Sequence, residues 1–234
     1  MEKGMCGLCR KRKGLIKFRY SPLLCGECFS KILEKRIRKG LREEKAVKRI
    51  IMAAKGKGIL ILDDGTYEAK ATIFLMKKIN RGFMAKIIVK KKIAINEDIF
   101  EDKKSILEWK RQGFSAVILP WSCEKEANYF LRGLFHECRA ENLGLVIERD
   151  GVVFVKLFLG AIAPELKFYC RFKKLGNAIR EKFRNDFTGC IGKEIELLEK
   201  KYPGTKFGLL RSAKAMKKIL WGKSQKTSGM NWGR

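Results

Sequence analysis

Two close pairs of cysteines stand near the start of the chain. Cys6 and Cys9 form one pair and Cys25 and Cys28 the other, with two residues inside each pair and 15 residues between the pairs. Four thiolates from two short turns can complete a tetrahedron around one Zn²⁺, which then holds together a segment too small to form its own core. Reduced CxxC turns or two disulfides are the alternatives, but the paired spacing favours zinc. We therefore expect residues 1–30 to form a zinc ribbon or knuckle with a structural Zn²⁺.

The segment between the cysteine pairs is strongly basic, and so is the whole chain. Its 234 residues include 53 Lys and Arg against 25 Asp and Glu, a formal net charge of +28. A positive surface gains affinity for nucleic acid by releasing counterions from the phosphates. We therefore predict binding to a nucleic acid, to which the zinc segment contributes Arg10, Lys11, Arg12, Lys13, Lys17 and Arg19.

An anionic membrane is the other polyanion that such a charge could meet. The sequence contains no run of 18 apolar residues that could span a bilayer, and a start occupied by cysteine pairs does not resemble a secretory signal. We expect a cytoplasmic protein without membrane contact. The remaining cysteines, which lie among apolar neighbours, are expected to be buried thiols: Cys123, Cys138, Cys170 and Cys190.

A single basic helix is predicted to link the zinc segment to the rest of the chain. Between residue 29 and about residue 54, apolar side chains recur at near-helical steps, and residues 31–57 form the predicted linker. Its other face is cationic, which indicates either a solvated surface or an RNA contact. The RNA contacts predicted on this helix are Lys35, Arg38, Lys39 and Arg42.

From residue 58 onward, short apolar runs alternate with amphipathic stretches. This pattern is typical of βαβ units, in which helices bury both faces of a parallel sheet. Residues 145–147 and 152–159 form either a hairpin or a strand pair across a tight turn. We predict a Rossmann-like α/β domain over residues 58–212, with strands at 59–62, 85–89 and 116–119 and helices at 68–80, 103–112, 124–135, 165–174, 177–183 and 193–201.

The C-terminal segment carries only positive charge. From residue 200 to residue 234 there are ten Lys and Arg and no acidic residue. Residues 213–234 are predicted to form a basic tail, which either improves solubility or binds RNA. The RNA contacts predicted in this part of the chain are Lys206, Arg211, Lys214, Lys217 and Lys218.

The turn after the first predicted strand is where a doubly wound fold binds phosphates. A phosphate cradle needs glycines and donors aimed at the anion. Residues 63–68 supply one glycine and three carboxylates, which would repel a nucleotide tail. The acids either cap the following helix or hold Mg²⁺. A degenerate nucleotide site would consist of Asp63, Asp64, Gly65 and Thr66.

The order of these features resembles the archaeal and eukaryotic tRNA 2-thiolation enzymes of the PP-loop ATP pyrophosphatase superfamily. Residues 63–68 stand where the family has Ser-Gly-Gly-x-Asp-Ser, and residues 119–127 are similar to its His-Asn-Leu-Asp-Asp-Glu-Ala helix. Residues 198–207, followed by Leu-Arg-Ser at 210–212, resemble its Leu-Glu-x-x-x-Pro-Gly-Thr-Lys-Tyr and Leu-Arg-Ser. The resemblance implies a Rossmann-like fold of the adenine nucleotide alpha hydrolase type.

Active members of the family adenylate a uridine with ATP and deliver sulfur through cysteines or a cluster, and two of those cysteines form a mid-domain CxxC. No CxxC follows Cys28 here. The resemblance with a broken loop implies a pseudoenzyme that binds tRNA as a docking factor or beside a catalytic paralogue. Two alternatives stay open: a ribosome-associated component that uses the fold as a basic platform, and an active sulfurtransferase that uses Cys123, Cys170 or Cys190.

Overall fold

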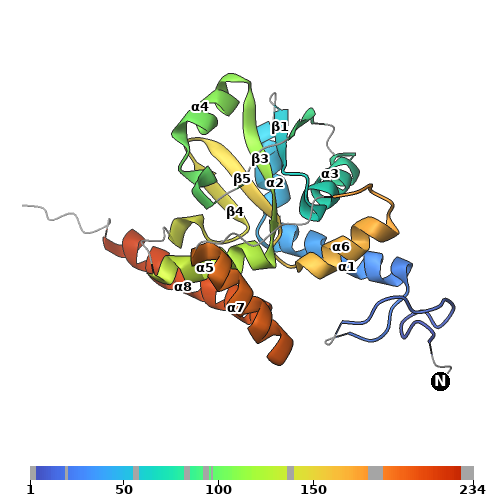
Figure 1. The fold of residues 1–234 in the computed structure, drawn as a ribbon. Coiled ribbons are helices and arrows are strands. Elements are labelled where there is room, and N and C mark those ends of the chain that lie inside the picture. The colour runs from blue at the N-terminus through green and yellow to red at the C-terminus, as the bar shows by residue number, and fades with distance from the viewer. Residues whose placement is uncertain are drawn as a thin grey trace, which may run out of the picture.

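The structure is a computed structural model, and it describes residues 4–18, 21–54, 58–81, 85–91, 95, 97–135, 140–178 and 187–227. Helices and strands alternate through most of the chain (Figure 1). In chain order the elements are α1 (Gly26–Glu43), α2 (Ala46–Ala54), β1 (Gly58–Asp63), α3 (Tyr67–Asn80), β2 (Ile87–Lys91), η1 (Glu97–Phe100), α4 (Lys103–Arg111), β3 (Phe114–Ser122), α5 (Cys123–Phe135), η2 (Ala140–Asn142), β4 (Val146–Arg149), β5 (Val152–Phe158), α6 (Ala163–Phe172), α7 (Phe187–Lys201) and α8 (Thr205–Thr227).

Five strands form one sheet in the order β2-β1-β3-β5-β4. Four of them are parallel, and β4 pairs antiparallel with β5. The two possibilities predicted for this pair resolve as a hairpin, whose turn residues Asp150 and Gly151 both have positive φ, at 49° and 74°; this geometry matches the strand twist. Because the chain leaves β1 toward β2 and then crosses to β3 on the other side, the switch point of the sheet lies between β1 and β3.

The central strands form the core. Every residue of β1 and of β3 is buried, so helices cover both faces of the sheet there. The predicted Rossmann-like α/β architecture is confirmed. Within the described ranges, none of the helices combines the length and the apolar character that crossing a bilayer requires.

The cysteine-containing segment packs on this core rather than standing apart from it. Phe29, on the first turn of α1, meets Phe168 of α6 edge to face, with ring centroids 5.1 Å apart. Gly26 lies so close to Phe172 that a Cβ on it would come within 2.1 Å of the ring. The close approach requires glycine at this position. Buried residues then continue without interruption from Cys6 through α1 to the sheet.

Three predicted elements differ from the structure. The single basic helix is two helices, α1 and α2, because the chain turns at Lys45, whose φ is 51°. The second strand lies two residues later than predicted, as β2. The predicted helix at 177–183 is wrong at residues 177 and 178, which are not helical, and its remainder lies outside the described residues.

The predicted C-terminal tail is also different. Residues 205–227 form one long helix, α8, which packs against α5 and α7 (Figure 1). The predicted boundary at residue 213 therefore falls inside a helix. Ala213 itself is buried, because this stretch turns an apolar stripe toward α5.

Candidate functional site

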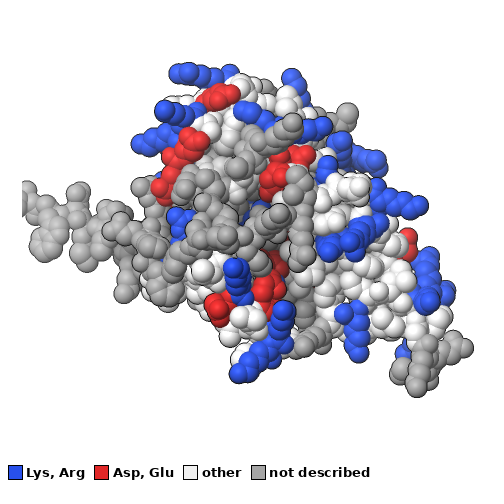
Figure 2. All heavy atoms as spheres, in the orientation of Figure 1, with Lys and Arg blue, Asp and Glu red and all other residues white. Residues whose placement is uncertain are grey.

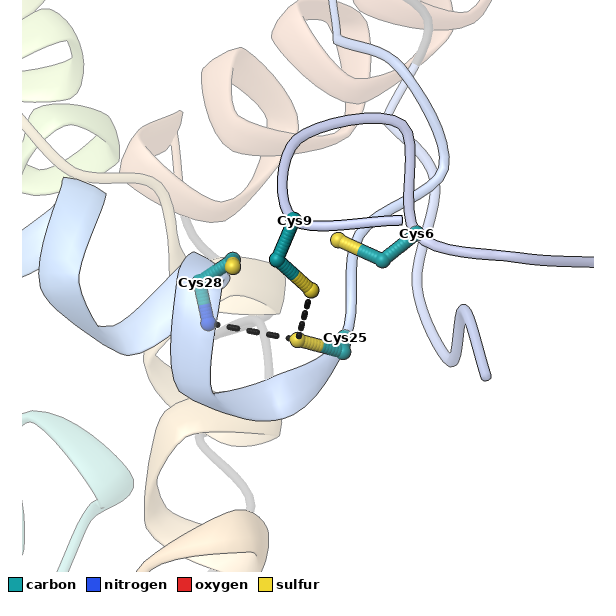
Figure 3. Close-up of side chains that lie close together, drawn as sticks. All are labelled: Cys6, Cys9, Cys25 and Cys28. Atoms are coloured by element: carbon teal, nitrogen blue, oxygen red, sulfur yellow. Dashed lines mark hydrogen bonds between the residues drawn. The ribbon is translucent and has the colours of Figure 1, made fainter. Parts of the chain in front are cut away.

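The four N-terminal cysteines converge on one point. Cys6 and Cys9 come from the loop before α1, Cys25 is the N-cap of α1 and Cys28 lies in its first turn. Their sulfur atoms all lie within 4.8 Å of one another, as Figure 3 shows. The Sγ atoms of Cys9 and Cys25 are 3.8 Å apart, and the Cys28 backbone N–H donates to the Cys25 sulfur. The structure thus brings together the predicted metal ligands.

The spacing of the sulfurs fits a single ion. A tetrahedral site with metal–sulfur bonds of about 2.3 Å has sulfur–sulfur edges of about 3.8 Å, which matches the Cys9–Cys25 distance. The ligands of a [4Fe–4S] cluster sit on four separate iron corners and are further apart. Among the described residues, these cysteines form the one group of three or more metal-binding side chains.

The thiols of this group differ in their acidity. Burial opposes ionisation of Cys6, but backbone N–H groups that donate to its sulfur outweigh burial and lower its pKa to about 6. Burial and then the neighbouring sulfurs raise the pKa of the Cys28 thiol to about 12. A divalent cation at the centre of the four sulfurs removes the repulsion between thiolates, so metal binding and deprotonation are linked.

The basic side chains predicted around this centre are exposed. The loop cations Arg10, Lys11, Arg12, Lys13 and Lys17 all face solvent, and Arg12 approaches Glu27 only at 4.0 Å. Arg19 lies outside the described residues. On α1 the four predicted cations are also exposed: Lys35, Arg38, Lys39 and Arg42. Figure 2 shows Lys and Arg along the side of the molecule that carries α1, α3 and α6, and further ones over α4.

The C-terminal cations divide into two groups. Arg211, Lys214 and Lys218 are exposed, and Lys214 lies 3.7 Å from Glu44. Lys217 is half-buried, which lowers the pKa of its ammonium, and it donates to the backbone carbonyls of Glu141 and Leu143. These hydrogen bonds hold α8 against the loop before β4.

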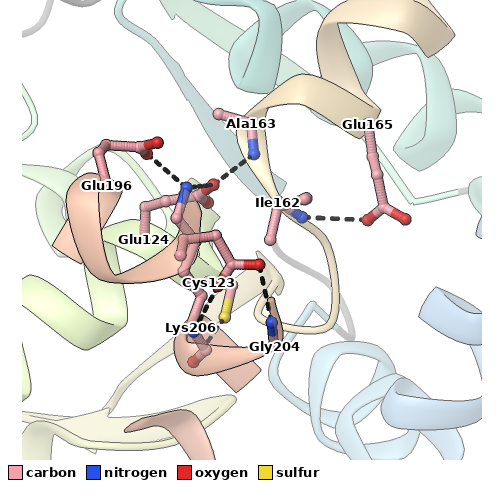
Figure 4. A network of polar contacts seen from close by, with 9 residues as sticks. Cys123, Glu124, Ile162, Ala163, Glu165, Glu196, Gly204 and Lys206 are labelled. Atoms are coloured by element: carbon pink, nitrogen blue, oxygen red, sulfur yellow. Dashed lines mark hydrogen bonds and ion pairs between the residues drawn. The ribbon is translucent and has the colours of Figure 1, made fainter. Parts of the chain in front are cut away.

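The prediction of an RNA contact is wrong for Lys206, which is 1% exposed. Its ammonium lies between the carboxylates of Glu124, at 2.9 Å, and Glu196 (Figure 4). Burial alone would lower the pKa of Lys206, but the two carboxylates outweigh it and raise the pKa. The ammonium is therefore charged and paired with two carboxylates inside the fold.

This buried cation holds the start of α8 against the first turn of α5. Glu124 also accepts from the Ala163 N–H, and burial raises its pKa. Glu199 closes the turn by accepting from the N–H groups of Gly204 and Lys206, both at 2.9 Å (Figure 4). The Pro-Gly-Thr-Lys sequence at 203–206 thus has a structural role.

The turn after β1 is satisfied by its own side chains. Asp63 accepts from the Gly65 N–H at 2.8 Å, and Asp64 accepts from the N–H and the hydroxyl of Thr66. Thr66 is the N-cap of α3 and accepts from the Ala69 N–H. The prediction that the acids cap the helix is wrong for Asp63 and Asp64, which instead accept hydrogen bonds within the turn. The cap itself is the threonine hydroxyl.

An ion pair spans the switch point of the sheet. Asp64, just after β1, lies 3.2 Å from the ammonium of Lys125, in the first turn of α5 after β3. Their side chains are 10% and 12% exposed. A phosphate in this crevice would meet the Asp64 carboxylate and would have to compete with it for Lys125. No local sequence pattern indicates this pairing, although each residue follows the end of a central strand.

Comparison with known proteins bears on the fold. The sequence matches no family model and no curated protein. The structure is similar to the U34-tRNA thiolase NcsA from Methanococcus maripaludis, solved with its [4Fe-4S] cluster, with a TM-score of 0.66 and 12% sequence identity. The two chains share their overall fold. The similarity covers 93% of this chain and 88% of the thiolase.

NcsA was solved with an iron–sulfur cluster. The burial and hydrogen bonds of the remaining cysteines in this chain decide whether they could act as cluster ligands or sulfur carriers. Cys123 donates to the Lys206 carbonyl, and burial raises the pKa of its thiol. Cys170 donates to the Tyr67 carbonyl, and burial raises the pKa of its thiol to about 12. Both are buried as predicted, whereas Cys190 is exposed, contrary to the prediction. Cys138 lies outside the described residues.

Proposed function

We propose that this protein binds tRNA without modifying it, as a docking factor or as the non-catalytic partner of a related thiolase. The Asp64–Lys125 ion pair carries this proposal. It occupies the switch-point crevice of a thiolase fold, where the family resemblance implies that the ATP phosphates bind. Asp64 stands where the family resemblance places a phosphate-binding residue. Its carboxylate lies 3.2 Å from the Lys125 ammonium.

The distribution of charge supports RNA as the partner. The net charge is +28, and exposed cations extend from the loop at residues 10–17 along α1 and recur on α8. Phosphate contacts from separate elements of one rigid fold suit a folded RNA better than a flexible peptide, because a structured backbone presents its charges at fixed positions.

The state of the cysteines supports the absence of sulfur transfer. A sulfur carrier must be a reachable thiolate. Cys123 and Cys170 are buried, with raised pKa values and with carbonyl partners. Cys190 is exposed, but no second metal-binding group accompanies it among the described residues.

We further infer that the four-cysteine module holds Zn²⁺ as a structural ion. The sulfur spacing fits one tetrahedral ion. The ion would be held by Cys6, Cys9, Cys25 and Cys28 and would fix the basic loop relative to the start of α1. An iron–sulfur cluster at this position is the alternative, and visible absorption together with iron content of anaerobically purified protein distinguishes the two.

One purification tests the function. The protein is isolated from its own cells at low salt, the RNA that accompanies it is sequenced, and the same preparation is incubated with labelled ATP and tRNA. We expect enriched tRNA and no release of AMP. AMP release that disappears in Gly65→Val or Cys190→Ser would show an active enzyme. Enriched ribosomal RNA would favour the ribosomal platform, and the absence of RNA would overturn RNA binding.

A further inference from the structure

A groove of about 680 Å³ lies along α1, where this helix meets the end of α3 and the start of α2. Leu41, Val47 and Ile79 give it an apolar floor. Five cations line it, four from α1 and one from α3: Lys31, Lys35, Arg38, Arg42 and Lys78. Lys31 and Lys78 were not among the predicted RNA contacts.

The four cations of α1 form one stripe. Lys31, Lys35, Arg38 and Arg42 follow one another at steps of four, three and four residues, so they share a face of the helix. The stripe is about 16 Å long at 1.5 Å per residue. Like charges at this spacing destabilise a helix on its own, and a row of phosphates along the groove would relieve their repulsion.

A buried carboxylate holds two of the cations that line the groove. Glu34, 8% exposed, accepts from the Lys78 ammonium at 2.6 Å and from the Tyr169 hydroxyl at 2.9 Å. Arg38 lies 3.6 Å from the same carboxylate. Glu34 is a positioning residue, because it holds a lysine of α3 and an arginine of α1 beside the same groove. The lining still has five positive side chains against one negative.

We propose that this groove seats one strand of a folded RNA, with its phosphates along the α1 stripe and Lys78 and with a ribose or base edge on the apolar floor. This inference rests on the proposed function and adds the place of the contact. The groove begins at Lys31, three residues after the last metal ligand, so the exposed loop at residues 10–17 extends the same positive surface past its end.

Two variants of equal charge test the assignment. The groove variant combines Lys31→Gln, Lys35→Gln, Arg38→Gln and Arg42→Gln. The control combines Lys103→Gln, Lys104→Gln, Lys110→Gln and Arg111→Gln on α4, which are exposed and lie at the far end of the molecule from the metal module (Figure 1). Affinity for a tRNA transcript is measured by filter binding over a range of salt concentrations.

The groove variant is expected to lose at least about a hundredfold in affinity at low salt, and its plot of log K against log salt is expected to flatten by about 3. The α4 control should change severalfold at most. Circular dichroism checks the fold of both proteins. Should the fourfold variant not fold, the milder pair Lys35→Gln and Arg42→Gln should still flatten the plot by about 1.5.

Equal losses in the two variants would overturn the groove and leave RNA binding through general charge intact. Failure of the unaltered protein to bind tRNA would overturn both the groove and the proposed function. Inorganic tripolyphosphate is used as a competitor to distinguish an RNA strand from a small polyphosphate as the ligand of the groove. If it displaces tRNA at equal phosphate concentration, the groove binds small polyanions and the assignment of an RNA strand is wrong.

Discussion

The ammonium of Lys156 on β5 lies 2.5 Å from the carboxylate of Glu126 on α5, and both side chains are completely buried. The carboxylate also accepts from the Gly144 N–H, and the ammonium donates to the Asn142 carbonyl at 2.7 Å. The rings of Phe100, Trp121 and Tyr129 surround the ammonium, with centroids 4.6 to 5.1 Å away. The pair thus joins α5, β5 and the loop before β4 inside the core.

The two members of this pair should be strongly coupled in stability. Glu126→Gln or Lys156→Met alone leaves a buried charge without its counter-charge and should lower the free energy of unfolding by about 3–5 kcal/mol. The double variant should lose less than the sum of the two. Urea unfolding of the four proteins measures the coupling. The exposed pair Lys39–Glu43 is the control, and additive effects at the buried pair would contradict the prediction.

Two glycines should respond in opposite directions to alanine. Gly65 has a φ of 80°, so Gly65→Ala should destabilise the fold by about 1–2 kcal/mol. Gly40 lies inside α1, and a Cβ there would meet nothing within 4 Å; Gly40→Ala should stabilise by about 0.5–1 kcal/mol. Thermal unfolding measures both changes. A stabilised Gly65→Ala would show that the turn adopts another backbone conformation.

Zinc binding by the four cysteines is tested with two cysteine variants. Cys28→Ser removes one of four converging ligands, so bound zinc should fall from about one ion per chain to a small fraction, and the melting temperature should drop by at least about 4 °C. Cys190→Ser removes an exposed thiol on α7 and should change neither. Elemental analysis and thermal unfolding are the measurements. Full zinc content in Cys28→Ser would exclude this site.

Glu34 predicts a dependence of stability on pH. Burial alone would raise its pKa, but Lys78, Tyr169 and Arg38 outweigh burial and hold the pKa below the ordinary 4.5. A carboxyl with a depressed pKa in the folded state stabilises the protein above about pH 4.5, and this contribution is lost as the pH falls through the folded-state value.

The test compares the unaltered protein with Glu34→Gln. The variant should be less stable by about 1–3 kcal/mol near pH 7, and the difference should shrink steadily as the pH falls below about 4.5. Urea unfolding at several pH values gives both curves. A difference that stays constant with pH would mean that the Glu34 charge contributes nothing to the fold.

Local patterns predicted the central strands well because β1 and β3 are buried along their whole length. They missed the break between α1 and α2, since no proline or glycine marks residues 44 and 45. The turn at Lys45 lets Ala46 and Ile50 of α2 reach the core, which is a tertiary requirement. The helix α8 was predicted as a tail because its sequence is rich in positive charge. Its short apolar stripe, with Leu210 and Ala213 buried, is a weaker sequence pattern than that charge.

The convergence of the four cysteines could be predicted from their spacing alone, whereas the ion pairs could not be. Lysine is rarely buried, and nothing local distinguishes Lys206 or Lys156 from the exposed lysines of this chain. The pairing of Asp64 with Lys125 depends on β3 lying beside β1, which is a property of strand order. Composition predicted a positive surface but could not predict the groove. The groove brings together cations from two helices, with Lys78 coming from α3 and the others from α1.

The Asp64–Lys125 pair also constrains how this lineage can change. Substitution of Asp64 by a small residue strands a largely buried ammonium, and substitution of Lys125 strands a largely buried carboxylate. Removal of both charges from the switch point therefore requires two replacements together, because each single step passes through a less stable protein. Once both residues are in place, selection for folding alone is enough to keep them.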